Sequence, residues 1–226
     1  MCNLYSLTSG QQAIRETFRT MADTTGNLPP MPGIYPDQMA PVVRTGPAGR
    51  ELTMMRWGFP APPGVAGNRP VTNVRNTGSA YWREWMQPAQ RCLVPVDLFC
   101  EYAAGTPAVP HWFALPAEPP LFAFAGLWRP WTGTRGPKAA PVEGAHRLFA
   151  FLTCAPNATV GAVHPKAMPV MLTTSEEFDA WLHAPLEEAL ALQRPLPDSM
   201  MRVVPPPADA AAKPAQKARP AQGSLF

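Results

Sequence analysis

The distribution of apolar residues along the chain predicts many short strands. Apolar runs at residues 40–44 and 51–57 flank Gly46 and Gly49, which predicts a β-hairpin. Other runs of strand length are found at residues 2–8, 92–96, 98–102, 112–115, 121–127, 148–154, 170–172 and 201–204. Because turn-forming residues separate these runs, we expect a curved, mainly antiparallel, barrel-like sheet.

Helical patterns occur mostly near the two ends of the chain. Ser9 and Gln12 match a capping box and predict a helix over residues 10–22. That helix would bury a face formed by Ile14, Phe18 and Met21. A second capping box, Thr174 with Glu177, predicts a helix directly after it. Shorter helices are expected at residues 80–87 and 185–193, and loops at 26–37 and 58–70. This order of elements predicts an α+β fold in one domain, residues 2–204.

The amino-acid composition favours short elements in a folded domain and a disordered tail. Proline accounts for 31 of the 226 residues, against a usual share of about 5%. Because proline breaks helices and central strands, short elements joined by stiff turns are expected. The apolar share of 46% with only 15% charged residues excludes disorder of the whole chain. From residue 205 onward Pro, Ala and Lys dominate, which predicts a disordered tail at 205–226.

The charge distribution limits the partners. The net charge is +3, and two of these charges belong to the tail. There is no general basic field for nonspecific binding to nucleic acid, so any such contact must be local. No apolar run is long enough for a membrane span, and no export signal is visible. We therefore expect a cytoplasmic protein, monomeric and without membrane contact.

The four cysteines and four histidines show no metal-ligand spacing. We expect no metal and no cofactor, and we expect buried free thiols instead of disulfides.

Cys2 has the most distinctive chemistry. Removal of Met1 would make it the N-terminus, with an amine of pKa about 7.7–8.0 and a thiol of pKa about 8.5 on adjacent carbons. Such an aminothiol can form an imine with an aldehyde and close to a thiazolidine, or it can attack an acyl group. Taken by itself, the position favours an inert cysteine.

Three further residues could carry acid–base or polar chemistry. Asp97 and Glu101 interrupt the apolar run 91–102, and burial would suit Glu101 to general acid–base catalysis. The more common alternative is a glutamate that faces solvent at a strand end. His164 lies just before an apolar strand, although a single histidine is more often structural.

The sequence resembles the SRAP family, the SOS-response-associated peptidase-like proteins that process abasic sites in single-stranded DNA. The similar segments occur in the family's order over residues 2–172, and more loosely to about 204. They are Met1-Cys2, Arg56-Trp57-Gly58, Asn73-Val74-Arg75, residues 91–102, 125–128 and 152–157, and His164 with 168–172.

The resemblance implies a covalent reaction with damaged DNA. Cys2, exposed by removal of Met1, would trap the aldehyde of an abasic deoxyribose as a thiazolidine crosslink that shields the lesion. Asn73 would orient the Cys2 amine or the opened sugar, and Glu101 would assist ring opening and proton transfer. His164 would move protons around the Schiff base and assist release of the crosslink.

The resemblance also implies DNA contacts around this centre. Arg75 would bind a phosphate and Trp57 would stack on a neighbouring base, with Arg56 and Asn3 as further contacts. A short cationic groove with an aromatic platform is typical of single-strand binding.

The chain departs from the family pattern in several places. Asn3 replaces a glycine and Leu4 replaces an arginine that contacts DNA, so affinity for DNA would be lower unless Arg15 or Arg56 substitutes. The segment after His164 is one residue longer, with Lys166 in place of an arginine.

The abasic-site chemistry could include β-elimination at the same amine, as in an abasic-site lyase. Two alternatives to this chemistry stay open. In the first, the same residues serve an N-terminal-nucleophile cysteine peptidase that processes itself. The chain end, residues 222–226, resembles the short peptide that binds the bacterial sliding clamp, with Gly223 in place of leucine. The second alternative is therefore a noncatalytic, clamp-tethered DNA-binding protein.

Overall fold

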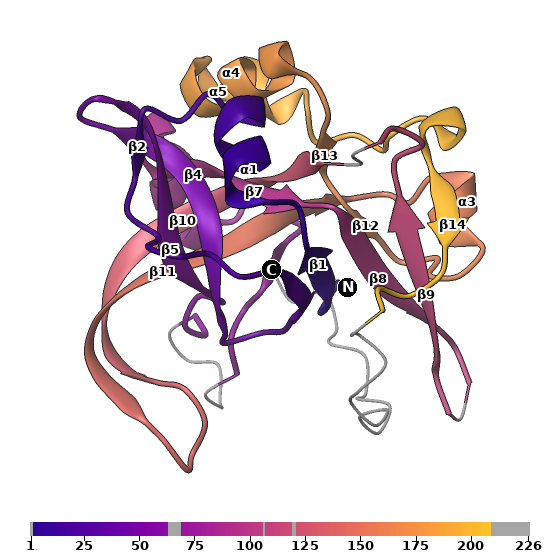
Figure 1. Cartoon of the computed structure of the whole chain (residues 1–226), viewed down its shortest axis with the longest axis horizontal. Helices are drawn as coiled ribbons and strands as arrows, with labels where there is room; N and C mark the ends of the chain where they lie inside the picture. The colour runs from indigo at the N-terminus through magenta and orange to yellow at the C-terminus, as the bar shows by residue number, and fades with distance from the viewer. Residues whose placement is uncertain (1, 63–68, 106, 119–120, 209–226) are drawn as a thin grey trace.

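The protein is described by a computed structural model that covers residues 2–62, 69–105, 107–118 and 121–208 (Figure 1). Its centre is a β-barrel. The larger sheet has the strand order β12-β11-β10-β7-β4-β5-β2. These strands span Met168–Pro169, Val142–Cys154, Phe122–Arg135, Arg91–Val96, Met39–Gly46, Gly49–Trp57 and Ala22–Asp23. A parallel pairing of β5 with β11 closes the five strands from β11 to β5 into a ring.

A smaller sheet lies beside the barrel, with the order β14-β9-β8-β1-β3. Its strands span Arg202–Val204, Val109–Ala114, Leu98–Ala103, Tyr5–Leu7 and Met31–Ile34. Two short strands join the barrel from outside: β6 (Asn73–Val74) pairs with β11, and β13 (Met171–Leu172) pairs with β10. Apart from three parallel pairings, those of β5 with β2 and of β11 with β5 and β6, the strands described here pair antiparallel.

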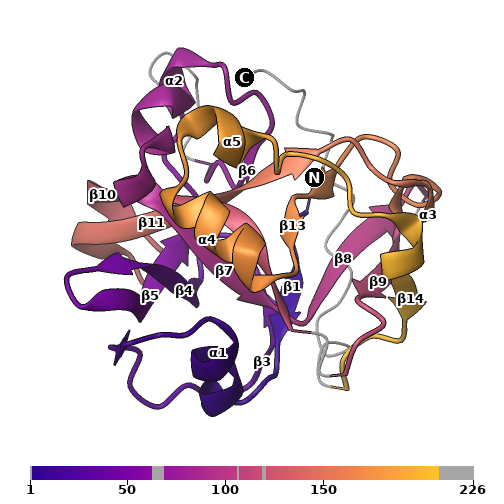
Figure 2. The same cartoon turned by 90° about the horizontal axis from the view of Figure 1, so that it is seen from above.

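The helices are short and lie outside the sheets. They are α1 (Gln11–Thr17), α2 (Ala80–Arg83), α3 (Ala158–Gly161), α4 (Ser175–His183) and α5 (Leu186–Leu190), with 3-10 turns at Glu84–Met86, Pro88–Gln90 and Asp198–Met200. In Figure 2, α4 lies across β7 with α5 beside it. The indole of Trp181 fixes α4 there by donating to the carbonyls of Cys92 and Gly126. No helix in the described part of the chain is long and apolar enough to cross a membrane.

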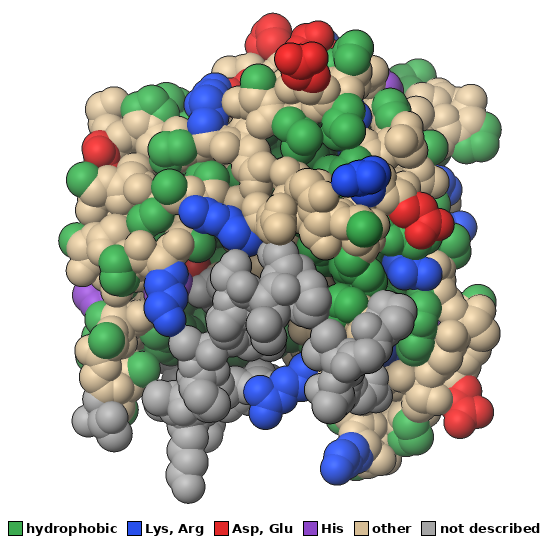
Figure 3. Space-filling model, turned by 180° about the vertical axis from the view of Figure 1, so that it is seen from behind, with side chains coloured by type: hydrophobic (Ala, Val, Ile, Leu, Met, Phe, Trp, Pro, Cys, Tyr) green, Lys and Arg blue, Asp and Glu red, His purple; other side chains and the backbone are tan. Residues whose placement is uncertain are grey.

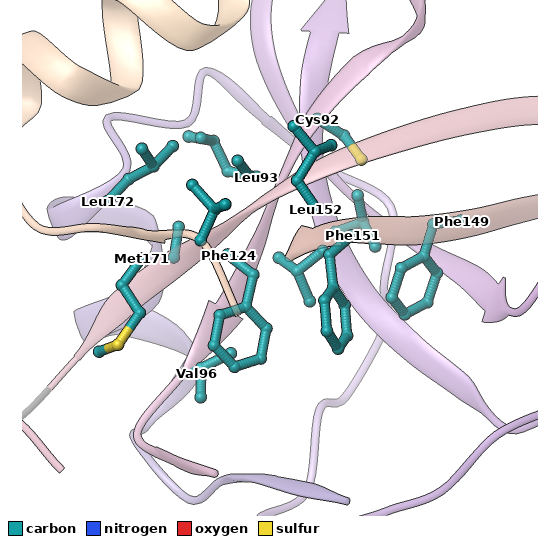
Figure 4. Packing of buried hydrophobic residues seen from close by; sticks show 14 of the residues in the cluster. Cys92, Leu93, Val96, Phe124, Phe149, Phe151, Leu152, Met171 and Leu172 are labelled. Carbon is teal, nitrogen blue, oxygen red and sulfur yellow. The ribbon is translucent and has the colours of Figure 1, made fainter. Parts of the chain in front are cut away.

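The hydrophobic core fills the barrel. Phe124, Phe149 and Phe151 lie within it, contributed by β10 and β11 (Figure 4). The ring centroids of Phe124 and Phe151 are 4.6 Å apart. Gly126 lets β10 approach β7, since a Cβ there would lie 2.7 Å from the Cys92 sulfur. The predicted α+β fold with a mainly antiparallel, barrel-like sheet is confirmed, and the four cysteines are buried and free as expected.

The two predicted capping boxes have different outcomes. Thr174 caps α4, and its hydroxyl accepts from the amide of Glu177 at 3.2 Å. The prediction at Ser9 is wrong: α1 begins after Gly10 without a side-chain cap, because the Ser9 hydroxyl donates to Asp97 instead.

Element boundaries account for the other differences. The first helix ends at Thr17, so Met21 is 74% exposed and does not join a buried face. The region 26–37 is not all loop, because β3 lies within it and pairs with β1. Strands β10 and β11 also run much further than predicted, and form the long ribbon visible in Figure 1.

Candidate active site

Cys2 lies three residues before β1 begins at Tyr5, and the pairing of this segment with β8 buries it. Strand β1 pairs with β8 in the register Tyr5↔Phe99, and the Cys100 amide donates to the Leu4 carbonyl at 2.9 Å. The Cys2 side chain has no exposed surface, and its thiol donates to the Leu4 carbonyl at 3.4 Å. Burial, followed by the nearby Glu101 carboxylate, raises the pKa of this thiol well above its ordinary value. The sulfur is therefore protonated at neutral pH.

Asn73 contacts Cys2 from the barrel side. It lies on β6, whose parallel pairing with β11 sets Asn73 beside Phe151. The Asn73 amide nitrogen donates to the Cys2 carbonyl at 3.0 Å and to the Thr72 hydroxyl at 2.7 Å. The Asn73 Oδ1 atom is buried and has no hydrogen-bond partner among the described residues. A buried acceptor of this kind suits the α-amine of Cys2 that removal of Met1 would free.

Glu101 approaches Cys2 from the small sheet. Its side chain lies on β8 and is 2% exposed, and this burial raises its pKa from 4.5 to about 7. The Nδ1 atom of His164 lies 3.9 Å from the Glu101 Oε2 atom. Burial, with positive charges nearby that include Lys166, lowers the pKa of His164 from 6.5 to about 4.

At neutral pH His164 is therefore neutral and Glu101 is close to half-protonated. Both shifts favour the uncharged forms, so the 3.9 Å contact is not an ion pair at neutral pH. That distance is also too long for a direct hydrogen bond between these two atoms.

His164 is held by the turn that follows α3. Its backbone amide donates to the Val160 carbonyl at 2.8 Å. The side chain of Asn157 caps α3 by accepting from the Val160 amide at 2.9 Å, and it donates to the Leu196 carbonyl at 3.0 Å. Asn157 thus connects the His164 turn to the rest of the fold.

The structure does not support the prediction that Trp57 stacks on a DNA base. Trp57 ends β5 with its side chain pointing into the barrel and has no exposed surface. Its ring stacks on Phe149 and Phe151, and its indole nitrogen donates to the Thr72 carbonyl at 3.2 Å. Trp57 instead supports the segment that carries Asn73, because its indole is bonded to Thr72, the residue before Asn73.

The predicted DNA-contact residues differ in whether their side chains are exposed or already engaged in contacts within the fold. Arg75 and Asn3 are exposed. The guanidinium of Arg56 donates to the Asp37 carbonyl and lies 3.9 Å from the Asp37 carboxylate, so it is committed to the fold. Leu4, at the position of the family's arginine, is buried against Cys100 and Trp112.

Figure 3 shows several Asp and Glu side chains at the top of one face, where α4 and α5 lie, and others elsewhere on it. Lys and Arg are spread over the same face and are not gathered into one patch. The chain end at 222–226 lies outside the described residues, so clamp binding stays a prediction.

Sequence reasoning missed two polar residues that hold the centre together, Thr72 and Asn157. The Thr72 hydroxyl lies within hydrogen-bond distance of both Asn73 and Asn3. Asn157 carried a signal, since asparagine is one of the preferred N-cap residues. Thr72 carried none, because its role depends on the approach of residues 2 and 3.

The fold and the candidate site together define a class: α+β barrel proteins with a buried cysteine at position 2, an amide and a carboxyl group close to it, and an imidazole beside the carboxyl group. A family model described as SOS response associated peptidase (SRAP) matches residues 1–208. The chain belongs to the SRAP family, which confirms the resemblance noted in its sequence.

Known proteins similar to this chain agree with that assignment. The abasic site processing protein YoqW of Bacillus subtilis is 27% identical over 191 residues, which cover 81% of this chain and 80% of the relative. A protein of the same name from Bacillus phage SPbeta has the same values.

Solved structures show the same fold. A protein from Bordetella bronchiseptica superposes with a TM-score of 0.70 at 22% identity, covering 90% of this chain and all of the other. A protein from Bacteroides thetaiotaomicron gives a TM-score of 0.67 at 20% identity, covering 90% and 92% of the two chains.

Proposed function

We propose that this protein captures abasic sites in single-stranded DNA through a covalent thiazolidine bond to Cys2. The observation that carries the proposal is the enclosure of Cys2 by Asn73 and Glu101, with the unpartnered Asn73 Oδ1 atom close to the Cys2 backbone. The printed name of the Bacillus relatives, abasic site processing protein, supports the substrate.

The reaction begins at the amine. Removal of Met1 frees the α-amine of Cys2, which attacks the aldehyde carbon of the ring-opened abasic sugar to give a carbinolamine. Loss of water from the carbinolamine forms an imine. The thiol then adds to the imine carbon, and its proton passes to the nitrogen, which closes the thiazolidine with one water released overall. This order follows from the pKa of the buried thiol, which keeps the sulfur protonated until the imine is present.

Glu101 and His164 divide the proton transfers. The carbinolamine must lose its hydroxyl as water, which requires an acid, and a carboxyl with a pKa of about 7 can supply that proton near neutrality. His164 is neutral at this pH and can accept a proton from the reacting amine or sugar hydroxyl.

Asn73 and the exposed residues position the DNA. The Asn73 Oδ1 atom accepts a hydrogen bond from the freed Cys2 amine. Arg75, exposed beside this residue, binds a backbone phosphate, and Asn3 contacts the strand next to the lesion. Few charges are needed, because the covalent bond supplies the lasting attachment.

The proposal is tested with protein that has lost Met1 and a single-stranded oligonucleotide carrying one abasic site. We expect a shifted band on a denaturing gel that survives heating. An oligonucleotide of the same sequence without the lesion should give none. The absence of any heat-stable band with wild-type protein would overturn the proposal.

The order of the steps is tested with Cys2→Ala, which keeps the α-amine but removes the sulfur. We expect no spontaneous heat-stable product, but an imine that borohydride reduction traps. Cys92→Ala is the matched control, since Cys92 is also a buried free cysteine but lies on β7. A heat-stable product from Cys2→Ala without borohydride would show that the sulfur is not needed.

The peptidase reading receives less support. A cysteine peptidase acts through a thiolate, and burial holds the Cys2 sulfur in its protonated form. The described contacts of the thiol are with backbone carbonyls, whereas His164 faces Glu101.

A further inference from the structure

Asp97 lies at the turn between β7 and β8, and its carboxylate is 3% exposed. It accepts four hydrogen bonds from the two residues that follow β1. The amides of Thr8 and Ser9 donate to Oδ2 at 2.6 and 2.7 Å, and the Thr8 hydroxyl does so at 3.1 Å. The Ser9 hydroxyl donates to Oδ1 at 2.7 Å. The Asp97 amide in turn donates to the Ser6 carbonyl at 2.9 Å.

We infer that Asp97 is a positioning residue for the reaction at Cys2: it fixes the register of β1 against β8 and thereby holds Cys2 beside Glu101. The inference rests on the proposed function for its effect on catalysis. The anchoring itself follows from the contacts alone.

Strand β1 needs such an anchor because it is only three residues long. Its register with β8 pairs Tyr5 with Phe99 and Ser6 with Leu98, and the same register continued sets Asn3 opposite Glu101. A slip of one residue would turn each side chain to the opposite face, and a slip of two would move Cys2 by about 7 Å. Either change breaks the 3.0 Å contact between Asn73 and the Cys2 carbonyl.

The other neighbour of β1, strand β3, pairs with it less regularly. The pairing of β1 with β3 shifts between Tyr5 and Leu7, so that edge is irregular. At its start the N-terminal segment is held by Asn73, and at its end by Asp97. Together these two contacts bracket β1 and leave one register.

The use of a carboxylate is also informative. A buried carboxylate is costly unless it is fully bonded, and no Lys, Arg or His in the described part of the chain forms an ion pair with Asp97. The amides and hydroxyls of Thr8 and Ser9, in the N-terminal segment that also contains Cys2, stabilise its negative charge. Charge-assisted bonds are short and directional, so this arrangement fixes position more tightly than apolar packing would.

The test compares Asp97→Ala and Asp97→Asn with Thr174→Ala, which removes the cap of α4. The first readout is the rate at which iodoacetamide alkylates Cys2 in the native protein, followed by peptide mass spectrometry. The second is the crosslinking rate at saturating abasic DNA, with the half-saturating DNA concentration measured separately. Circular dichroism confirms folding of each variant.

For Asp97→Ala we expect Cys2 alkylation to be about tenfold faster and the maximal crosslinking rate about tenfold lower, with an unchanged half-saturating concentration. Asp97→Asn should fall between, because its carbonyl still accepts from both amides. Thr174→Ala should change the melting temperature and neither rate.

The inference fails if Asp97→Ala lowers the melting temperature but leaves both rates at the wild-type value. Should Asp97→Ala not fold, Asp97→Asn and the double variant Thr8→Ala/Ser9→Ala decide by the same criteria. Should wild-type protein form no crosslink, the proposed function fails, and the alkylation rates still decide whether Asp97 anchors Cys2.

Discussion

Replacing Glu101 by glutamine tests whether burial or a charge pair controls this site. Glutamine has nearly the same shape but cannot ionise. If burial dominates, Glu101 lowers the stability of the folded wild-type protein at high pH, because the folded chain must either keep the carboxyl proton or bury a charge. If an ion pair with His164 dominated, the carboxylate would stabilise the fold at neutral pH and glutamine would weaken it.

The expected size follows from the pKa. Below pH 4.5 Glu101 is protonated in the folded and unfolded chains, and it contributes no penalty. Between pH 4.5 and about 7 the unfolded chain loses its proton while the folded chain keeps it, so wild-type stability falls as the pH rises. At about 1.4 kcal/mol for each pKa unit, the loss amounts to about 3 kcal/mol.

Urea unfolding of wild type and Glu101→Gln, at pH values from about 5 to about 8, measures this difference. The advantage of the variant should grow up to about pH 7 and then level off. His164 titrates at lower pH in both proteins, so its contribution largely cancels in the comparison. A difference that stays constant with pH, or a wild type that gains stability over the variant as pH rises, would refute burial as the cause.

Two further predictions separate support of the fold from contact with DNA. Trp57→Phe should lower the free energy of unfolding by about 2 kcal/mol, because it removes the bond to Thr72 and leaves a cavity in the core, and it should leave affinity for single-stranded DNA unchanged. Weaker DNA binding at an unchanged melting temperature would contradict this, and calorimetry with a fluorescence titration measures both. Arg75→Ala should reduce the slope of log affinity against log salt by about 0.7. Arg56→Ala is its control, because Arg56 is bonded to Asp37, and equal salt slopes for the two variants would contradict the assignment.

Local patterns predicted the parts of the fold that local forces determine. The hairpin of β4 and β5 followed from two apolar runs around a glycine turn, and its register pairs Gly46 with Gly49. The cap at Thr174 followed from its own side chain. The same pattern failed at Ser9, because a residue 88 positions away in sequence competes for that hydroxyl.

The long ribbon of β10 and β11 could not be predicted, because tertiary contacts stabilise residues with weak strand patterns. Arg135 is buried, donates to the Gly58 carbonyl and lies over the ring of Trp131. Proline, glycine and charged residues in this stretch conceal the strands in the sequence.

The site was predictable only in part. Cys2, Glu101 and His164 stood out by their own chemistry and the resemblance added Asn73, and the structure brings these four together from separate elements. Trp57 was assigned to the surface by the same resemblance, although alternation along β5 indicates the opposite, since Met55 and Trp57 share its buried face. The role of Asp97 depends on contacts across the fold, and no spacing in the sequence points to it.

The burial of Cys2 also has a consequence for biosynthesis, because Met1 is removed more easily before folding buries Cys2 than after it. With translation initiated at Met1, as the proposed chemistry requires, Cys2 leaves the ribosome early, whereas β8, which covers it, ends at Ala103. At about 5–20 residues per second, roughly 5–20 s separate the synthesis of the two. During that interval an aminopeptidase can act on the nascent N-terminus before Cys2 loses its exposed surface. The proposed chemistry therefore favours processing during translation, and a slow aminopeptidase would yield folded chains whose amine is blocked.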